Sequence, residues 1–297
     1  MIPSLRNYIK HLFKKKVTQN TQASSIPNEP VLPNLPPEAT ISFDSGLLKG
    51  KKVLVTGAGE NIGKSICKEM AAQGAQIYFT DIKAEKCLRL ENEMLTNNII
   101  TRGFNLDCSN IDELDKLLST LKKESIHIDI LVNNVGMTPS IKPFRKIDIS
   151  EWQQVFNTNV IGPSYLTKNI VQTMIENKIH GSIIFITSIH QQTIFGSSSY
   201  SSSKAALGML IKELSMEFAK DNIRVNGIAP GWVVENEQQN SLYHELTPLH
   251  KCSINPRYIG RSAVYLASDY FSRFTTGAIV KIDGGLSLHS YLTTNQD

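Results

Sequence analysis

A tyrosine and a lysine four positions apart, Tyr200 and Lys204 in "SYSSSK", are the residues of this sequence most suited to proton transfer. Side chains at positions i and i+4 of a helix lie on the same face. A free phenol, with a pKa of about 10, is a poor base at neutral pH. A nearby ammonium in a partly dehydrated cleft favours the phenolate and lowers that pKa. The spacing predicts a general acid and base, although a solvated helix face could carry the same pair by chance.

A glycine-rich turn, "TGAGENIG" (56–63), joins a short apolar segment to a helical one. Glycines let the backbone approach a pyrophosphate, and the following helix N-terminus offers free N–H groups and a positive dipole. The common G-x-G-x-x-G pattern is not met, because Ile62 occupies its sixth place. The turn predicts a dinucleotide phosphate site, and a tight turn without a ligand is the alternative.

Asp81 ends the second apolar segment, 18 residues after Gly63. A carboxylate at about this distance from the glycine turn accepts hydrogen bonds from the adenosine ribose. It would repel a 2′-phosphate, and the turn itself carries no Arg or Lys before Gly63. Asp81 therefore predicts NAD(H) rather than NADP(H), unless it is only a turn or helix-capping residue.

Seven β-rich segments alternate with helical ones from residue 51 onward, at 51–57, 75–81, 103–107, 128–134, 182–188, 223–230 and 278–285. Strands joined by helical crossovers form a parallel sheet with helices on both faces. Right-handed crossovers place the strand C-termini along one edge, where ligands bind. We expect an α/β, Rossmann-like, doubly wound seven-stranded parallel sheet in a single domain.

Together these motifs resemble the classical short-chain dehydrogenase/reductase family over about residues 49–287. "TGAGENIG" is similar to the family's TGxxxGxG turn, with Asn61 replacing the middle glycine. Asparagine tolerates left-handed backbone better than other non-glycine residues. The resemblance implies that the cofactor is contacted by Gly57, Gly59, Asn61, Ile62, Gly63, Asp81, Asp107, Asn134, Tyr200, Lys204, Pro230, Gly231 and Val233. Within that set Asp107 would contact adenine, and Asn134 of "NNVG" would support the sheet and the adenosine side of the cofactor.

The resemblance also implies four catalytic residues: Asn159, Ser188, Tyr200 and Lys204. Ser188 would polarise the substrate oxygen. It lies 12 residues before Tyr200, one fewer than is common in the family, so Thr187 is the alternative residue for this role. Lys204 would also bind the nicotinamide ribose hydroxyls. Asn159 would hold a water that links Lys204 to solvent, or would be a polar residue at a helix kink with a satisfied side chain. No metal is expected.

The predicted activity is NAD(H)-dependent interconversion of a secondary alcohol and a ketone, with Tyr200 as general acid and base. After "GIAPGW" the family often has a threonine that contacts the nicotinamide amide, whereas this chain has Val234, Glu235 and Asn236. The departure leaves that contact open. It motivates an alternative, an NAD(H)-binding regulatory or scaffold protein of the same fold with reduced catalysis.

The substrate class is suggested by polar residues. The predicted lid over the site, about residues 234–256, is polar and rich in amides, and His190 and Gln191 follow Ser188. These features favour a polyol, sugar or hydroxy acid over a steroid, although His190 can equally be an ordinary loop residue. The family resemblance implies a tetramer or dimer built through long helices, here about 151–178 and 199–220.

Charge and composition restrict the remaining possibilities. The chain has 297 residues and a net charge of +4, but residues 1–28 carry five basic residues and no acid, so the rest sums to −1. A near-neutral body argues against nucleic acid as a partner. Four cysteines without a CxxC pair, and no apolar run of about 20 residues, predict a cytoplasmic protein.

Residues 1–48 form a basic, Pro-rich extension that we expect to be poorly ordered, followed by the catalytic domain at 49–297. Within the extension, residues 5–16 place apolar side chains near helical spacing beside lysines. This pattern suits a membrane-surface helix, a partner-binding helix or a targeting presequence, and equally a solvated tail.

Overall fold

The computed structural model describes residues 46–235 and 247–288. The expectations for residues 1–45, for Asn236 and for the part of the predicted lid at 236–246 lie outside these described residues. The described chain begins with a turn at 46–49, in which Leu48 is only 1% exposed and belongs to the hydrophobic core. Packing of the domain therefore starts just before residue 49.

Seven strands form one sheet in the order β3-β2-β1-β4-β5-β6-β7, and every neighbouring pair is parallel. The strands are β1 (Lys52–Val55), β2 (Gln76–Asp81), β3 (Thr101–Asn105), β4 (Ile130–Asn133), β5 (Ser182–Ile186), β6 (Arg224–Pro230) and β7 (Ile279–Ile282). The predicted doubly wound sheet is confirmed. The order reverses between β1 and β4, which is where such folds bind ligands.

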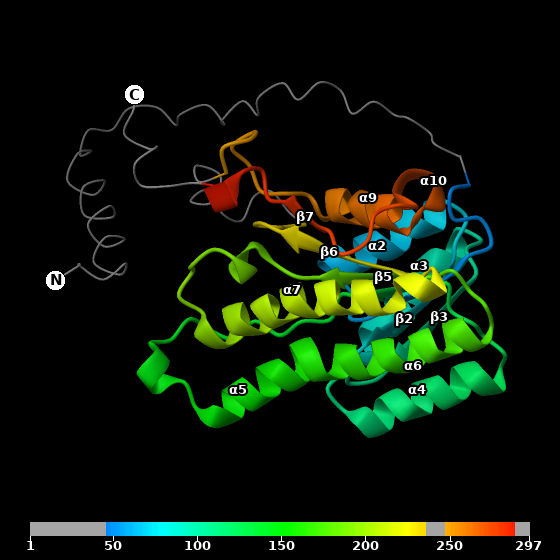
Figure 1. The fold of residues 1–297 in the computed structure, drawn as a ribbon, viewed down its shortest axis with the longest axis horizontal. Coiled ribbons are helices and arrows are strands. Elements are labelled where there is room, and N and C mark those ends of the chain that lie inside the picture. The colour runs from blue at the N-terminus through cyan, green and yellow to red at the C-terminus, as the bar shows by residue number, and fades with distance from the viewer. Residues whose placement is uncertain (1–45, 236–246, 289–297) are drawn as a thin grey trace. The chain divides into compact units, whose positions relative to one another are not determined.

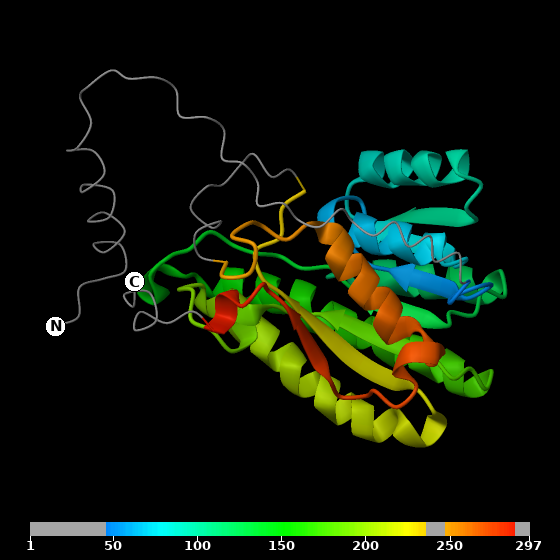
Figure 2. The ribbon, with the colours of Figure 1, turned by 90° about the horizontal axis from the view of Figure 1, so that it is seen from above.

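Helices cover both faces of the sheet (Figures 1 and 2). They are α2 (Asn61–Ala72), α3 (Ala84–Thr96), α4 (Ile111–Lys123), α5 (Ile149–Phe156), α6 (Gly162–Glu176), α7 (Ser198–Phe218), α9 (Pro256–Ala267) and α10 (Asp269–Ser272). Buried side chains of α2, α3 and α9 join one core cluster, and those of α4, α6 and α7 join another. The two clusters therefore lie on opposite faces of the sheet.

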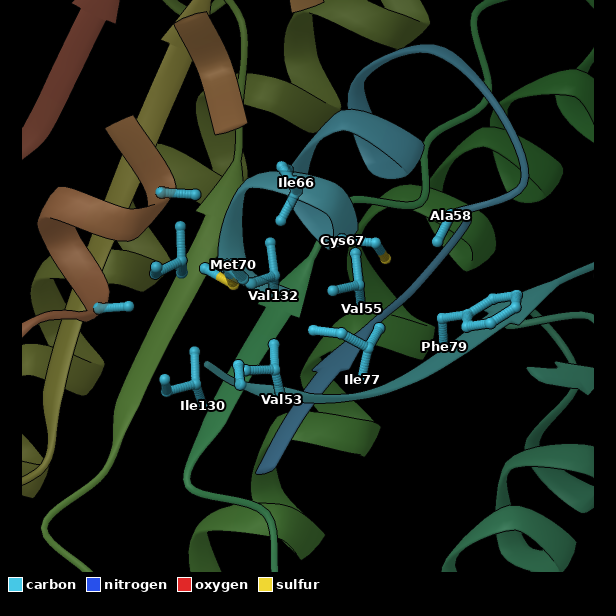
Figure 3. Packing of buried hydrophobic residues seen from close by; sticks show 14 of the residues in the cluster. Val53, Val55, Ala58, Ile66, Cys67, Met70, Ile77, Phe79, Ile130 and Val132 are labelled. Atoms are coloured by element: carbon cyan, nitrogen blue, oxygen red, sulfur yellow. The ribbon is translucent and has the colours of Figure 1, made fainter. Parts of the chain in front are cut away.

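Strand alternation explains the two cores. Successive side chains of a strand point to opposite faces. Val53 and Val55 accordingly enter the cluster beneath α2, whereas Leu54 between them enters the cluster beneath α4, α6 and α7. Figure 3 shows the first cluster, where Ile66 and Met70 of α2 lie over the β1 valines. This packing fixes α2, and with it the glycine turn, against the end of β1.

A π-helical turn, Asn157–Ile161, joins α5 to α6, so that the predicted central helix at 151–178 is one long element with an irregular middle. Such single-turn insertions often mark functional positions. Asn159 lies inside the turn and is fully buried. The sequence predicts the helix and leaves open a kink at Asn159, but it does not predict the π-helical form of this turn.

Within the described residues, no helix is long and apolar enough to cross a membrane. The same part of the chain contains no cluster of three or more acidic, histidine or cysteine side chains suited to a metal ion. All four cysteines are free thiols.

Candidate active site

The glycine turn is shaped for close backbone approach. Gly57 has φ +61°, a left-handed conformation that favours glycine. A Cβ on Gly63 would lie 2.5 Å from the Gly57 carbonyl oxygen, so the start of α2 can press against the turn only without a side chain. Asn61, in place of the family's middle glycine, adopts φ 47° as the sequence led us to expect. The left-handed backbone at this position is therefore kept without a glycine.

One polar atom at this turn lacks a partner. The Asn61 side-chain oxygen is buried and receives no hydrogen bond from the described residues. It lies at the first position of α2, where the helix N-terminus presents free N–H groups. An orphaned polar atom beside a backbone cradle fits a ligand with donor groups. The residues present therefore fit a dinucleotide.

Asp81 reaches the turn from the end of β2. Its Oδ2 accepts the Gly59 N–H at 2.9 Å, and its Oδ1 accepts the Lys83 N–H at 3.0 Å. Asp81 is 8% exposed, and a Cβ on Gly59 would lie 2.6 Å from its Oδ2. The carboxylate is thus fixed beside Gly59, as predicted for a residue near the adenosine ribose, and it also anchors the turn itself.

Asn134 supports the turn from β4. Its side-chain amide donates to the carbonyl oxygens of Thr56 and Gly57, at 2.9 and 2.8 Å. Both amide hydrogens of Asn134 are thus donated to the protein backbone. These bonds tie the end of β4 to the glycine turn, and the support of the adenosine side of the cofactor stays a prediction.

The remaining predicted cofactor residues lie around the same edge of the sheet. Asp107 accepts the Ser109 N–H and hydroxyl, which stabilises the turn after β3. On the far side of the switch point, β6 ends at Pro230, and Gly231 donates its N–H to Ile282 of β7 at 2.9 Å. Val233 is half-buried against the core beneath α2. Direct contacts of these residues with a cofactor stay predictions.

Tyr200 stands at the start of α7 with its hydroxyl hydrogen-bonded to Ser188 and to Thr138. The structure therefore brings together two residues predicted as partners, Ser188 and Tyr200, in spite of their shortened spacing. Burial raises the pKa of the Tyr200 hydroxyl above its usual value, and the two hydrogen bonds partly oppose this rise. The lowering that we expected from Lys204 is not found in this arrangement: burial dominates, and the opposing contributions come from Ser188 and Thr138 rather than from Lys204.

Lys204 lies one turn further along α7 and is 3% exposed. Its Nζ donates to the Ile186 carbonyl at 2.8 Å and lies 5.6 Å from the centroid of the Tyr200 ring. A Cβ on Gly136 would come within 3.3 Å of this Nζ, so the "NNVG" segment closes over the ammonium. Burial without a carboxylate partner lowers the pKa of Lys204 to about 8.

Asn159 is held on every side by protein. Its Oδ1 accepts the Met137 N–H at 2.7 Å, and its Nδ2 donates to the Met137 carbonyl and to the Ser203 hydroxyl, at 3.1 and 2.9 Å. The Ser203 hydroxyl in turn donates to the Tyr200 carbonyl at 2.7 Å. This geometry matches the alternative that the sequence left open, a satisfied side chain at a helix kink. A water relay, which stays a prediction, would have to use the Asn159 backbone.

Replacing Asn159 with alanine should therefore destabilise the domain and slow turnover together. The partly buried Met137 N–H and carbonyl and the buried Ser203 hydroxyl would lose their partner, which costs about 1–3 kcal/mol for each group that no water reaches. We expect a loss of about 2–5 kcal/mol in urea unfolding and a fall in kcat of tenfold or more. Asn169→Ala is the matched control, since its amide donates only to Tyr165 one turn away on α6. Equal effects of the two substitutions would contradict this role.

Thr187 is not a usable substitute for Ser188. Its hydroxyl donates to the Ile228 carbonyl of β6 at 3.1 Å, and the residue is 2% exposed. The fallback assignment is therefore wrong, because Thr187 points into the sheet while Ser188 faces Tyr200.

Two residues that contact the predicted catalytic residues were not predicted from the sequence. Thr138 hydrogen-bonds the Tyr200 hydroxyl, and Ser203 links Tyr200 to Asn159. Thr138 follows "NNVG" by two residues, a position from which a hydroxyl could have been suspected. Ser203 stands inside "SYSSSK", where three consecutive serines gave no reason to single it out.

A parallel doubly wound sheet, a glycine turn at its switch point and a Ser–Tyr–Lys set beside it define a nicotinamide-dependent oxidoreductase. Comparison with known proteins agrees. The family model described as short chain dehydrogenase matches residues 51–245. The chain therefore belongs to the short-chain dehydrogenase family, as the sequence resemblance indicated, and it is an NAD(P)-dependent enzyme acting on CH–OH groups.

Its relatives act on different substrates. The chain is 29% identical to a 3-oxoacyl-(acyl-carrier-protein) reductase of Aquifex aeolicus, covering 80% of this chain and 98% of the relative. It is 30% identical to a glucose 1-dehydrogenase of Gluconobacter oxydans, covering 83% and 95%. It is also 30% identical to a 5-keto-D-gluconate 5-reductase of Escherichia coli, covering 80% and 96%.

Solved structures place both nicotinamide cofactors in proteins of this fold. A 3-oxoacyl-(acyl-carrier protein) reductase of Brucella melitensis with bound NAD is 25% identical, with a TM-score of 0.76 and coverage of 82% and 94%. A gluconate 5-dehydrogenase of Burkholderia cenocepacia in complex with NADP and tartrate is 25% identical, with a TM-score of 0.76 and coverage of 84% and 100%.

Proposed function

We propose that this protein is an NAD(H)-dependent oxidoreductase that interconverts a polar secondary alcohol and its ketone, with Tyr200 as general acid and base. One observation carries the proposal: the Tyr200 hydroxyl is hydrogen-bonded to Ser188 and stands beside the buried Lys204 ammonium. A structural role alone does not account for a buried lysine without a carboxylate partner, because such a charge is costly.

The residues divide the chemistry between them. A nicotinamide cofactor, when bound, exchanges a hydride with the substrate carbon. In oxidation Tyr200 accepts the hydroxyl proton, and in reduction it returns a proton to the carbonyl oxygen. Ser188 donates a hydrogen bond to that oxygen and stabilises the charge that develops on it. Burial of the phenol dominates in the cofactor-free arrangement, and we infer that Lys204 favours the phenolate form of Tyr200 only together with the positive charge that an oxidised cofactor would bring.

A polyol, sugar or hydroxy acid is the proposed substrate class. Two of the relatives described above are named for glucose and for 5-keto-D-gluconate. The loop after Ser188 supplies His190, Gln191 and a run of serines close to Tyr200. The competing class is a 3-oxoacyl thioester, for which another relative is named.

Purified protein assayed with NAD, NADP, NADH and NADPH against two substrate panels tests the proposal. One panel holds polyols, aldoses and aldonic acids with their keto forms; the other holds 3-oxoacyl thioesters. Turnover of the first panel with NAD(H) supports the proposal, and turnover of the second alone replaces the substrate class. Cofactor binding without turnover of either panel would favour the alternative, an NAD(H)-binding regulatory or scaffold protein.

NAD(H) is the proposed cofactor because the Asp81 carboxylate is fixed beside Gly59. Two nearby cationic side chains, by contrast, would favour NADP(H). Lys86 pairs with Glu60 at 2.5 Å, and Arg89 donates to the Gly59 carbonyl at 3.4 Å. Both side chains are therefore close enough to serve a phosphate if the carboxylate charge is removed.

Asp81→Asn should shift the cofactor preference toward NADP(H). The amide oxygen can still accept the Gly59 N–H, but the Lys83 N–H loses its acceptor and the charge that repels a 2′-phosphate is removed. Removing a repulsion of about 1–3 kcal/mol raises the ratio of kcat/KM for NADP over NAD by about 10- to 100-fold. Glu85→Gln, the same charge change in the first turn of α3, is the control and should leave the ratio unchanged. An unchanged ratio in Asp81→Asn would remove the basis for the NAD(H) assignment.

We also propose a homodimer or homotetramer assembled through α6 and α7. The support is a set of exposed apolar side chains on these helices and the preceding π-helical turn: Ile161, Ile175, Met209 and Met216. Light scattering of the purified protein measures the assembly state directly.

We propose that residues 1–48 are an extension that precedes the catalytic domain at 49–297. We also propose that the protein is cytoplasmic. The five basic residues among 1–28 motivate a contact with an anionic membrane surface or an acidic partner. Salt-sensitive binding to anionic liposomes that disappears when residues 1–28 are deleted would support the membrane contact.

A further inference from the structure

His190 borders the active site without belonging to its Ser–Tyr–Lys set. It lies in a 3₁₀ turn, Ile189–Gln191, that begins directly after Ser188, and its N–H donates to the Ser188 hydroxyl oxygen at 3.2 Å. Its imidazole ring stands edge-on to the Tyr200 ring, with centroids 5.0 Å apart and planes at 81°. The ring therefore flanks the phenol whose hydroxyl meets Ser188.

Two neighbours fix the orientation of this ring. Phe195 stacks on it at 4.4 Å between centroids, with planes 28° apart. The Ser201 hydroxyl, on the first turns of α7, lies 3.1 Å from Nδ1. A ring held by stacking on one face and by a hydrogen bond at one nitrogen cannot turn freely. Such fixed orientation is what a binding residue needs and what an ordinary surface loop residue lacks.

The second ring nitrogen is available. No hydrogen bond from the described residues reaches Nε2, and this atom is not among the buried unpartnered atoms of that part of the chain. His190 also lines a hollow of about 350 Å³, which it shares with Gln191, Thr193 and serines of the α7 N-terminus. Nε2 is thus a polar atom that is oriented, accessible and unused.

The charge state of His190 narrows what it can bind. Burial and the nearby Lys204 ammonium lower the pKa of His190 to about 4, so that the ring is neutral at physiological pH. A neutral imidazole has one donor and one acceptor nitrogen. Whichever of these Ser201 engages, Nε2 can bond a hydroxyl group, because a hydroxyl both donates and accepts. A carboxylate suits only one of the two tautomers.

We propose that His190 Nε2 binds the hydroxyl on the carbon next to the reacting carbon, which makes His190 a residue that selects polyhydroxylated substrates. The inference rests on the proposed function, since it assumes that the reacting oxygen lies between Tyr200 and Ser188. Oxygens on adjacent carbons of a polyol lie within hydrogen-bond distance of each other, and His190 bonds Ser188 through its backbone N–H while its ring packs against the Tyr200 ring. A site built to bond a hydroxyl discriminates strongly against an analogue that lacks it.

The test compares a polyol that the enzyme turns over with its deoxy analogue, which lacks the hydroxyl next to the reacting carbon. His190→Phe keeps an aromatic ring for Phe195 and Tyr200 but removes both nitrogens. We expect the ratio of kcat/KM for the polyol over the analogue to fall by about 10- to 100-fold, mainly through KM, which is the range for losing one good hydrogen bond to substrate. His190→Gln, which can present an amide to the substrate, should restore part of the ratio.

Ser201→Ala is the second variant, and it guards against a folding defect in His190→Phe. It removes only the bond that orients the ring, and it should lower the same ratio to a lesser degree. An equal fall of kcat/KM on both substrates would mean that His190 only supports the Tyr200 ring, and the proposal would be overturned. An unchanged ratio would overturn it as well. Absence of turnover by the wild type on either compound would instead overturn the proposed function, and this inference with it.

Discussion

Tyr200→Phe is expected to reduce kcat by about 10²- to 10⁴-fold while leaving the affinity for NAD nearly unchanged. The substitution removes one oxygen and keeps the ring that packs beside His190 and the Lys204 ammonium. Proton transfer then lacks its acid and base, whereas the glycine turn and Asp81, which we propose to bind the cofactor, are untouched. Steady-state rates with any accepted substrate, together with titration of NAD by calorimetry, measure the two quantities separately.

Tyr165→Phe is the matched control, because its hydroxyl donates to Asp115 at the surface of the domain, away from the site. It should retain wild-type kcat. If Tyr200→Phe also retained wild-type turnover, the catalytic assignment would fail and only a nucleotide-binding fold would remain.

Much of this arrangement follows from local patterns in the sequence. Strand alternation and the helical repeat of α2 are local properties, and they were enough to predict a seven-stranded parallel sheet with its C-terminal edge as the site. Tyr200 and Lys204 lie on one helix, so their relation follows from helical geometry alone. Asp81 was predictable because the length of α2 fixes its distance from the glycine turn.

Contacts between distant segments were not predictable in this way. The hydrogen bonds from Asn159 to Met137 span 22 residues, and the one to Ser203 spans 44. No sequence pattern predicts that the side-chain amide of Asn159, in a π-helical turn, will bond the Met137 backbone in the loop after β4. The direction of the Tyr200 pKa shift was also missed, since burial, which raises this pKa, is a property of the whole fold and not of the local sequence.

The choice between Thr187 and Ser188 also depends on a contact between distant segments that the sequence does not predict. Neighbouring residues at a strand end point to opposite faces of the sheet, so only one of the two can face Tyr200. The sequence identified both as candidates. The register of β5 against β6, with Ile186 opposite Ile228, places Thr187 against the β6 carbonyl and leaves Ser188 at the site.

Lys204→Met should make the cofactor-free protein more stable at pH 7 while lowering kcat by 100-fold or more. Lys204 is buried, and its folded-state pKa of about 8 lies below the usual lysine value of 10.5. Below pH 8 the folded protein therefore carries a charge that it disfavours, at a cost of about 3 kcal/mol. Losing the bond to Ile186 offsets about 1 kcal/mol of the gain. The net gain of about 2 kcal/mol should raise the melting temperature by several degrees.

The pH dependence identifies the origin of this gain. Because the unfolded chain binds the Lys204 proton more tightly, the wild type gains stability as the pH rises from about 8 to 10.5. The methionine variant lacks this titration, so the difference in unfolding free energy should change by about 3 kcal/mol over that window, from about 2 kcal/mol in favour of the variant to about 1 kcal/mol in favour of the wild type. Other titrating groups cancel in the difference. Lys212→Met, an exposed change on the same helix, should show neither effect.

A lysine that weakens the fold at neutral pH fits a catalytic role better than a structural one. If Lys204→Met were less stable than the wild type at pH 7, with a difference that did not change with pH, the buried ammonium would be a stabilising part of the core. The argument that this charge is maintained for its effect on Tyr200 would then lose its energetic support, even if turnover were lost.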